Sequence, residues 1–203
     1  IYLNMNTSNM VIFLVHGYGS TGKQMKELFS SYLPVSEGYE LIPLEAPHVC
    51  DLFPDRKQWF KLSYLKEYLI PQIDLAVEYV ENKIIGEERL MEGWWFPYWL
   101  GGHSQGANVG GCLALRKVLQ PQTVNAISAS GPFITTKNEL EGIPPISIIH
   151  GQQDAMMPID KTIQDVNALK LKGVPVQLHV LEHMQHELNQ EALTYSKKLI
   201  LNS

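Results

Sequence analysis

Short continuous runs of apolar residues alternate along the chain with longer stretches in which apolar residues recur at helical spacing. The first run, Met10–Val15, is apolar at every position and ends at a glycine-rich segment, which is typical of a strand buried on both faces of a parallel sheet. Pro97 would remove a ladder hydrogen bond from a central strand, so we treat residues 92–97 as loop and begin the third strand after them. The predicted strands are Met10–Val15, Tyr39–Leu44, 98–101, 124–128, 146–150 and Val176–Leu181.

The stretches between these strands predict amphipathic helices. Ser20 is a candidate N-cap for the first helix, Pro71 suits the first turn of the second, and Gly173 is a candidate C-cap for the fourth. The third helix is predicted over residues 107–119 and the last over residues 189–201. The other three are marked by apolar positions at helical spacing: Met25, Leu28, Phe29 and Leu33 in the first helix; Ile73, Ala76, Val77, Val80 and Ile84 in the second; and Ile159, Ile163, Val166 and Leu169 in the fourth. Strands that alternate with helices predict the α/β class, with a mostly parallel sheet covered by helices on both faces.

Composition changes this picture mainly by exclusion. The chain has 203 residues, 45% of them hydrophobic, which fits a single domain over residues 1–203. A formal net charge of -5, with no cluster of Lys and Arg in the sequence, argues against nucleic acid as a partner. Two cysteines, Cys50 and Cys112, are too few for a disulfide framework, so we expect a reducing, cytoplasmic compartment. The apolar runs are too short to span a bilayer, and no Lys or Arg precedes Lys23 to form the positive region of a signal peptide.

One segment carries a recognisable chemical pattern. Residues 102–106, which we call the elbow, read Gly102-His103-Ser104-Gln105-Gly106 and lie between a predicted strand and a predicted helix. A serine on such a tight turn has a strained backbone, and only small residues two positions away on each side avoid a clash. The serine hydroxyl would then lie above a helix N-terminus, whose free N–H groups favour developing negative charge. The pattern predicts that Ser104 is a nucleophile; the alternative is a glycine-rich helix start with a capping serine.

A serine hydroxyl needs a base to become nucleophilic at neutral pH, and the base needs a carboxylate to orient it. Asp154 follows the predicted strand 146–150 after a short loop, and its alternative role is to cap the helix that starts near Pro158. His183 and His186 both lie on the loop after the last strand, and their positions alone do not decide which is the base. The order Ser, Asp, His along the chain is the one that the α/β-hydrolase arrangement uses.

The segment that closes the first strand is the oxyanion loop, residues 16–19, with the sequence His16-Gly17-Tyr18-Gly19. In the α/β-hydrolase arrangement an oxyanion is bound by one N–H from such a loop and one from the residue after the nucleophile. These would be the backbone N–H groups of Tyr18 and Gln105. We expect His16 to be buried and hydrogen-bonded to its loop. No histidine pair has convincing metal-ligand spacing, and the residues expected to be structural are His48, His103, His150, His179 and Cys112.

Together these motifs resemble those of the phospholipase/carboxylesterase branch of the α/β-hydrolases, which includes acyl-protein thioesterases and related bacterial carboxylesterases. The resemblance runs from about Val11 to the C-terminus. Its motifs are the oxyanion loop, Ala46-Pro47 followed by Gln58-Trp59-Phe60, the elbow, His150-Gly151-Gln-Gln-Asp154-x-x-x-Pro158, and Met184-x-His186. The resemblance implies that His186 is the base and that His183 stands where the family often has glycine. Trp59 resembles a tryptophan that flanks the family's acyl site, and its alternative is an aromatic that anchors its loop. His103 departs from the family, which frequently has Phe inside the elbow.

The resemblance implies a serine carboxylesterase or thioesterase that forms an acyl-enzyme and needs no metal or cofactor. Its substrate would be a small-molecule ester or thioester, or an acylated lipid or protein. The alternatives are a lysophospholipase, another α/β-hydrolase chemistry, and a binding protein built on a retired hydrolase scaffold. The short segments between strands leave no room for a cap domain, so we expect an open site covered at most by residues 47–62. The aromatic residues 94–99 are expected to join the core, with a partner-binding patch as the alternative. The oligomeric state is not indicated.

Overall fold

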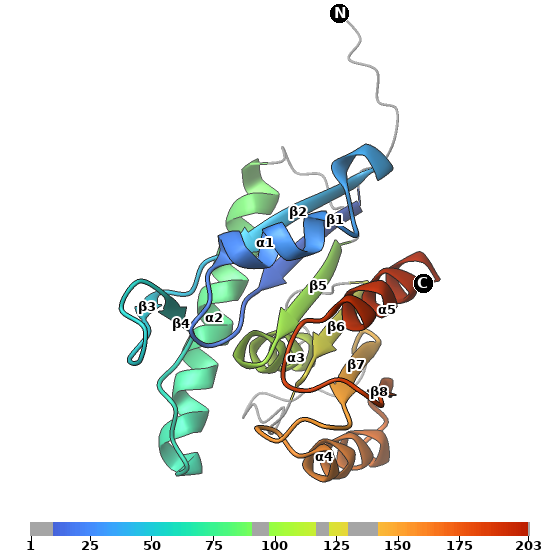
Figure 1. Ribbon diagram of the computed structural model, residues 1–203. Helices are drawn as coiled ribbons and strands as arrows, with labels where there is room; N and C mark the ends of the chain where they lie inside the picture. The colour runs from blue at the N-terminus through green and yellow to red at the C-terminus, as the bar shows by residue number, and fades with distance from the viewer. Residues whose placement is uncertain (1–9, 91–97, 117–121, 130–141, 203) are drawn as a thin grey trace, which may run out of the picture.

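A six-stranded parallel sheet forms the centre of the part of the chain that the computed structural model describes, which is residues 10–90, 98–116, 122–129 and 142–202 (Figure 1). The strand order is β2-β1-β5-β6-β7-β8, and each neighbouring pair is parallel. This confirms the predicted α/β class. The strands are β1 (Met10–Val15), β2 (Tyr39–Leu44), β5 (Tyr98–His103), β6 (Thr123–Ile127), β7 (Ile146–Gly151) and β8 (Val176–Leu181).

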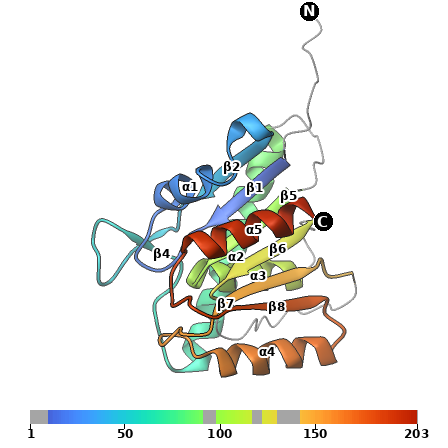
Figure 2. The same cartoon turned by 45° about the vertical axis from the view of Figure 1, so that its right-hand side comes forward.

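Helices cover both faces of this sheet (Figures 1 and 2). The buried side chains of α2, α3 and α4 pack in one hydrophobic cluster, and those of α1 and α5 pack in a second cluster on the opposite face. The helices are α1 (Gly22–Ser30), α2 (Lys66–Leu90), α3 (Gln105–Arg116), α4 (Ile159–Leu171) and α5 (Gln190–Leu201), with a short 3₁₀ helix, η1, at Val35–Glu37. Among the helices described here, none is both long enough and apolar enough to cross a membrane.

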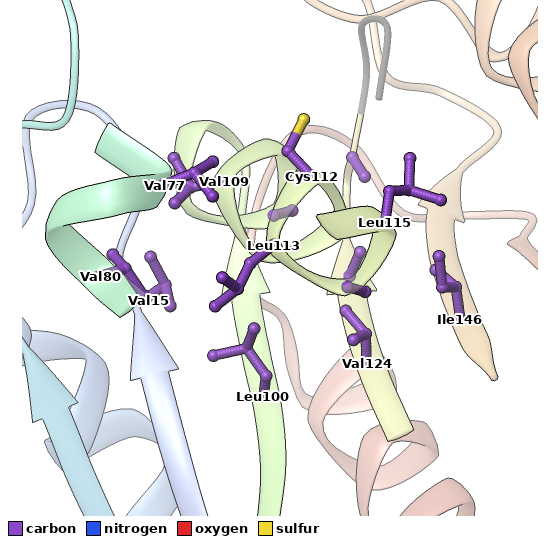
Figure 3. Close-up of a cluster of buried hydrophobic side chains, with 14 of the residues drawn as sticks. Val15, Val77, Val80, Leu100, Val109, Cys112, Leu113, Leu115, Val124 and Ile146 are labelled. Carbon is purple, nitrogen blue, oxygen red and sulfur yellow. The ribbon is translucent and has the colours of Figure 1, made fainter. Parts of the chain in front are cut away.

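The burial of β1 explains its continuous apolar sequence. Successive side chains of a strand point to opposite faces of a sheet. Leu14 therefore joins the cluster that holds Met25 of α1, while Val15 joins the cluster on the other face. In Figure 3, Val15 lies beside Val80 of α2, next to the buried side chains of α3. A strand covered on both sides has no polar face to present, which is why no alternation marks it in the sequence.

Two predicted helix starts are corrected by the structure. The N-cap of α1 is Thr21 and not Ser20, because the Thr21 hydroxyl accepts the N–H of Gln24 at 3.2 Å. Pro71 lies in the second turn of α2 rather than the first, since the helix begins at Lys66. The N–H groups of both Tyr68 and Leu69 donate to the carbonyl of Leu65, so a hydrogen-bonded turn already precedes the proline. Because proline has no backbone N–H, one carbonyl of the preceding turn lacks its helical donor, and only that one.

Other predicted boundaries shift by a few residues. β5 continues past residue 101 because Gly101, Gly102 and His103 remain paired with neighbouring strands up to the turn. Gly173 follows the end of α4 with a φ of +80°, as its predicted role at the helix end requires. Leu28, which shares the helical spacing of the core positions of α1, is 44% exposed. Of the aromatic residues 94–99, Tyr98 and Trp99 are in the core, while residues 92–97 and 117–119 lie outside the described residues.

A small antiparallel hairpin projects from the carboxyl edge of the sheet. It consists of β3 (His48–Val49) and β4 (Lys57–Gln58), and we call residues 48–58 the β3–β4 hairpin (Figure 1). The loops that follow β1, β5, β7 and β8 also leave the sheet at its carboxyl edge, because parallel strands all end on the same side. The predicted residues in these loops are Tyr18, Ser104, Asp154 and His186, while Gln105 begins α3 and Trp59 follows β4.

Candidate active site

Ser104 lies on a sharp turn between β5 and α3 and has a φ of 51°, in the left-handed region that residues with a side chain rarely adopt. The two flanking glycines make this turn possible. A Cβ on Gly102 would come within 2.5 Å of the Gly106 carbonyl oxygen, and a Cβ on Gly106 would come within 2.0 Å of the Val15 carbonyl oxygen. Both distances are far below any real contact, so the elbow requires glycine at these positions for steric reasons.

Ser104, His186 and Asp154 are brought together in one chain of hydrogen bonds. The Ser104 hydroxyl lies 2.9 Å from Nε2 of His186, and Nδ1 of the same ring lies 2.7 Å from Oδ2 of Asp154. With the proton on Nδ1, the imidazole donates to the carboxylate, and Nε2 accepts from the serine hydroxyl. His183, the alternative base, is exposed on the surface of the same loop.

Two loops in direct contact place Asp154 beside His186. A Cβ on Gly151 would come within 2.2 Å of the Met184 carbonyl oxygen, so glycine lets the loop after β8 pass against the end of β7. The N–H of Gln153 donates to the same Met184 carbonyl at 3.0 Å. This contact between the two loops sets the distance between the side chains of Asp154 and His186.

The Asp154 carboxylate is buried and fully engaged. Its Oδ1 accepts the backbone N–H groups of Met156 and Met157, at 3.0 and 2.8 Å, while Oδ2 accepts from His186. Capping of the following helix is not its role, because the residue at the N-cap of α4 is Pro158. His150, also buried, hydrogen-bonds through Nε2 to the Met157 carbonyl at 2.8 Å. The carboxylate is therefore held rigidly in the orientation that the His186 ring needs.

His103 introduces a second imidazole beside His186. Their ring centroids are 5.4 Å apart, and both residues line one open cavity. Burial, reinforced by the neighbouring His186, lowers the pKa of His103 to about 4. His103 is therefore neutral at neutral pH and adds no positive charge next to His186. The sequence pattern assigned His103 only a structural role, because nothing in the elbow motif indicates which side chain its second position contacts.

The oxyanion loop passes directly beside the elbow. A Cβ on Gly17 would lie 3.5 Å from Cβ of Ser104, so the peptide group that joins Gly17 to Tyr18 is close to the serine. Gln105 is the first residue of α3, and the first helical hydrogen bond runs from Asn108 N–H to the Ser104 carbonyl. The N–H of Gln105 consequently has no acceptor within its own helix. The two predicted N–H donors therefore belong to segments that meet at Ser104.

His16 is buried and bonded to its loop, as expected from the sequence. Its Nδ1 donates to the Gly17 carbonyl at 2.8 Å, and its Nε2 accepts the N–H of Ala46 at 3.2 Å. Burial is the largest influence on the pKa of His16 and lowers it, which favours the neutral ring that these two bonds require. His16 therefore acts as a brace between the oxyanion loop and the segment after β2.

Trp59 is buried and anchors the loop that carries it. Only 1% of its surface is exposed, and its indole N–H donates to the His16 carbonyl at 2.7 Å. The Gln105 side chain accepts the Trp59 backbone N–H at 3.0 Å and donates to the Phe60 carbonyl at 2.7 Å. Of the two roles that the sequence left open for Trp59, these contacts describe the anchoring one, because the tryptophan does not line the cavity. The clamp formed by the Gln105 side chain was not predicted, because no local pattern links residues so far apart in the chain.

Ser104 and His186 lie at the wall of an open cavity of about 1150 Å³. This is large beside the roughly 300–1,000 Å³ of ordinary small-molecule pockets. Its rim is mostly apolar and includes exposed side chains from three segments: Leu28, Leu52, Phe53, Leu62 and Met156. Three of these belong to the stretch 47–62 that was expected to cover the site. Within the described part of the chain, no group of three or more His, Cys, Asp or Glu residues is arranged to hold a metal ion.

Comparisons with known proteins agree with this architecture. A family model for phospholipases and carboxylesterases matches residues 4–202. Among solved structures, esterase PE8 superposes with a TM-score of 0.82 at 23% identity, covering 97% of this chain and 93% of that one. A carboxylesterase from Mesorhizobium loti gives 0.80 at 14%, covering 97% and 90%, and SOBER1 from Arabidopsis thaliana gives 0.79 at 19%, covering 96% and 99%. A search of curated proteins gave no match. The chain therefore belongs to the phospholipase/carboxylesterase family, and its fold is that of the α/β-hydrolases.

Proposed function

We propose that this protein is a serine hydrolase of carboxylic esters or thioesters, with Ser104 as nucleophile, His186 as general base and Asp154 as the orienting carboxylate. The observation that carries the proposal is the hydrogen-bonded chain from the Ser104 hydroxyl through His186 to Asp154, at the wall of an open cavity. Membership of a family of phospholipases and carboxylesterases supports a hydrolase of this kind.

The geometry suits acyl transfer in two stages. His186 takes the Ser104 proton on Nε2 as the serine oxygen attacks the acyl carbonyl, and Asp154 stabilises the imidazolium that forms. The N–H groups of Tyr18 and Gln105 would bind the oxyanion of the tetrahedral intermediate, and each such donor is commonly worth a factor of ~100–1000 in rate. The imidazolium then protonates the departing alcohol or thiol. Water activated by the same base releases the acyl group from Ser104.

The neutral state of His103 supports this mechanism. A positive charge on that ring would oppose the imidazolium that His186 becomes in each stage, since the ring centroids are only 5.4 Å apart. Burial keeps the pKa of His103 at about 4, so the opposing charge is absent at neutral pH.

The cavity supports an acyl donor with a substantial apolar part. Leu28, Leu52 and Met156 line it and are each well exposed, so an acyl chain entering it would cover apolar surface that is otherwise in water. The cavity is open and large enough for a bulky acylated molecule as well as a small ester. A lysophospholipid would be cleaved by the same chemistry and is distinguished by the assay below.

Hydrolysis of p-nitrophenyl esters with acyl chains of two to twelve carbons, of an acyl-coenzyme A thioester and of a lysophospholipid tests the proposal. The wild type should hydrolyse esters, with kcat/KM rising as the chain lengthens, and Ser104→Ala should lose activity by a factor of about 1000 or more. Ser31→Ala is the matched control, because Ser31 lines the same cavity outside the proposed machinery. Comparable hydrolysis by Ser104→Ala would refute the nucleophile, and no turnover of any substrate by folded protein would favour a binding protein.

A further inference from the structure

The β3–β4 hairpin is bonded to the oxyanion loop at successive residues. The N–H of Gly19 donates to the Lys57 carbonyl at 3.0 Å, and the N–H of Lys57 donates to the Ser20 carbonyl at 3.0 Å. Nη1 of Arg56 donates to the Gly19 carbonyl, also at 3.0 Å. The peptide groups on both sides of Gly19 are thus tied to the hairpin, immediately after the proposed oxyanion donor, Tyr18.

Packing holds the Arg56 guanidinium in this position. Gly19 has a φ of +65°, and a Cβ there would come within 2.8 Å of the Phe53 ring, so the ring lies directly against the glycine backbone. The Arg56 guanidinium carbon lies 5.3 Å from the centroid of the same ring. Such a cation–π contact is an electrostatic attraction between the guanidinium and the face of the ring. The hydrogen bond to the Gly19 carbonyl is charge-assisted and therefore stronger than one from a neutral donor.

Tyr18 is consequently held between two anchors. On its N-terminal side, the His16 ring donates from Nδ1 to the Gly17 carbonyl, and the His16 carbonyl accepts the N–H of the Trp59 indole. On its C-terminal side, Gly19 is fixed by the hairpin backbone and by Arg56. The Tyr18 N–H lies in the peptide group that joins Gly17 to Tyr18, and its direction is set by the rotation after the Gly17 α-carbon and the rotation before the Tyr18 α-carbon. The bond from His16 to the Gly17 carbonyl holds this peptide group itself, and the bonds to Gly19 hold the chain that follows Tyr18. Losing either anchor therefore frees the donor to turn away.

We propose that Arg56 is a positioning residue that holds the Tyr18 N–H toward the oxyanion by fixing the Gly19 carbonyl. This inference rests on the proposed esterase function. Arg56 lies on the cavity rim, so the competing role is direct recognition of an anionic group on the substrate. The two roles differ in kinetics: positioning changes the stability of the transition state for any ester, whereas recognition changes the binding of anionic esters only.

The test compares Arg56→Met, which keeps an apolar stem against Phe53, with Arg56→Lys and with Lys61→Ala. Lys61 is an exposed cation that lies, like Arg56, within residues 47–62. Lys61→Ala therefore removes one positive charge from the same segment and is the control for the charge that Arg56→Met removes. With a neutral p-nitrophenyl ester, Arg56→Met should lower kcat about 10- to 100-fold with KM within about twofold. Arg56→Lys should give an intermediate kcat, and Lys61→Ala should match the wild type.

A boronic acid inhibitor provides a second readout, because its tetrahedral serine adduct mimics the oxyanion state. Its affinity for Arg56→Met should fall by about the same factor as kcat, which a change confined to folding would not produce. The inference is overturned if kcat of Arg56→Met stays within twofold of Lys61→Ala, or if only KM for anionic esters changes. Either result would come from an active wild type, so it would leave the proposed function standing. A wild type without turnover would instead refute the proposed function.

Discussion

Replacing His103 with Phe tests the electrostatic description of the elbow. The pKa of a histidine in the unfolded chain is about 6.5, and burial lowers the pKa of His103 in the folded protein to about 4. Between these two values the unfolded chain binds a proton that the folded protein does not. The wild type must therefore lose stability as the pH falls from about 6.5 to about 4, while above pH 6.5 this residue contributes no pH dependence.

The size of the effect follows from the two pKa values. Each pKa unit corresponds to about 1.4 kcal/mol, and at pH 4.5 the proton taken up by the unfolded chain costs the native state about 2.5 kcal/mol. Phe at position 103 does not titrate, so His103→Phe lacks this loss. The remaining titratable groups are common to both proteins, and the difference between them isolates His103.

Urea unfolding at pH 7.5 and pH 4.5 measures this difference directly. On going to pH 4.5, the free energy of unfolding of the wild type should fall by about 2 to 3 kcal/mol more than that of His103→Phe. Equal losses in the two proteins would mean that His103 has the same pKa in the folded and unfolded chains, which contradicts the shift caused by burial. A smaller loss in the wild type would contradict even the direction of the shift.

Four further variants, one of them a control, test other parts of the structure. Gly106→Ala places a Cβ against the carbonyl of the last residue of β1 and should destabilise the protein by about 3 kcal/mol in urea unfolding. Gly86→Ala, in open space on α2, should instead be neutral or stabilising by up to about 1 kcal/mol; a mild effect at position 106 would contradict the steric account. Asp154→Asn should lower kcat about 10⁴-fold in an ester assay without unfolding the protein, and an unchanged kcat would exclude the orienting role. Arg116→Ala removes the 2.7 Å ion pair that ties α3 to Asp74 of α2 and should cost about 2–3 kcal/mol; a loss below 0.5 kcal/mol in thermal or urea unfolding would show that the pair is immaterial.

The positions of the strands along the chain were predictable because each strand leaves a local signal. Met10–Val15 is buried on both faces, so its hydrophobicity alone identifies a central strand. The elbow was equally visible, since its two glycines are required by clashes within the turn itself and with the adjoining end of β1. Strand order was not visible, because it depends on pairing between segments far apart in the chain.

The choice between His183 and His186 could not be predicted from the local sequence pattern. The two residues share a loop, and the packing of that loop against the end of β7, with Gly151 beside the Met184 carbonyl, brings His186 to Asp154. The resemblance to the family named His186, whereas the residues alone left the two open. The anchoring contacts of Trp59 depend in the same way on tertiary neighbours, and so does the bond from Arg56 to Gly19. The motif around Trp59 marks the residue but not its partners, and no motif marks Arg56.

Covalent labelling tests whether Ser104 is a nucleophile that His186 activates. The wild type is incubated with a fluorophosphonate, digested, and mapped by mass spectrometry beside Ser104→Ala and His186→Ala. We expect one adduct per chain, located on Ser104, with labelling absent in Ser104→Ala and slowed at least about 1000-fold in His186→Ala. An adduct on a different residue, or none at all from a protein that hydrolyses esters, would contradict this expectation.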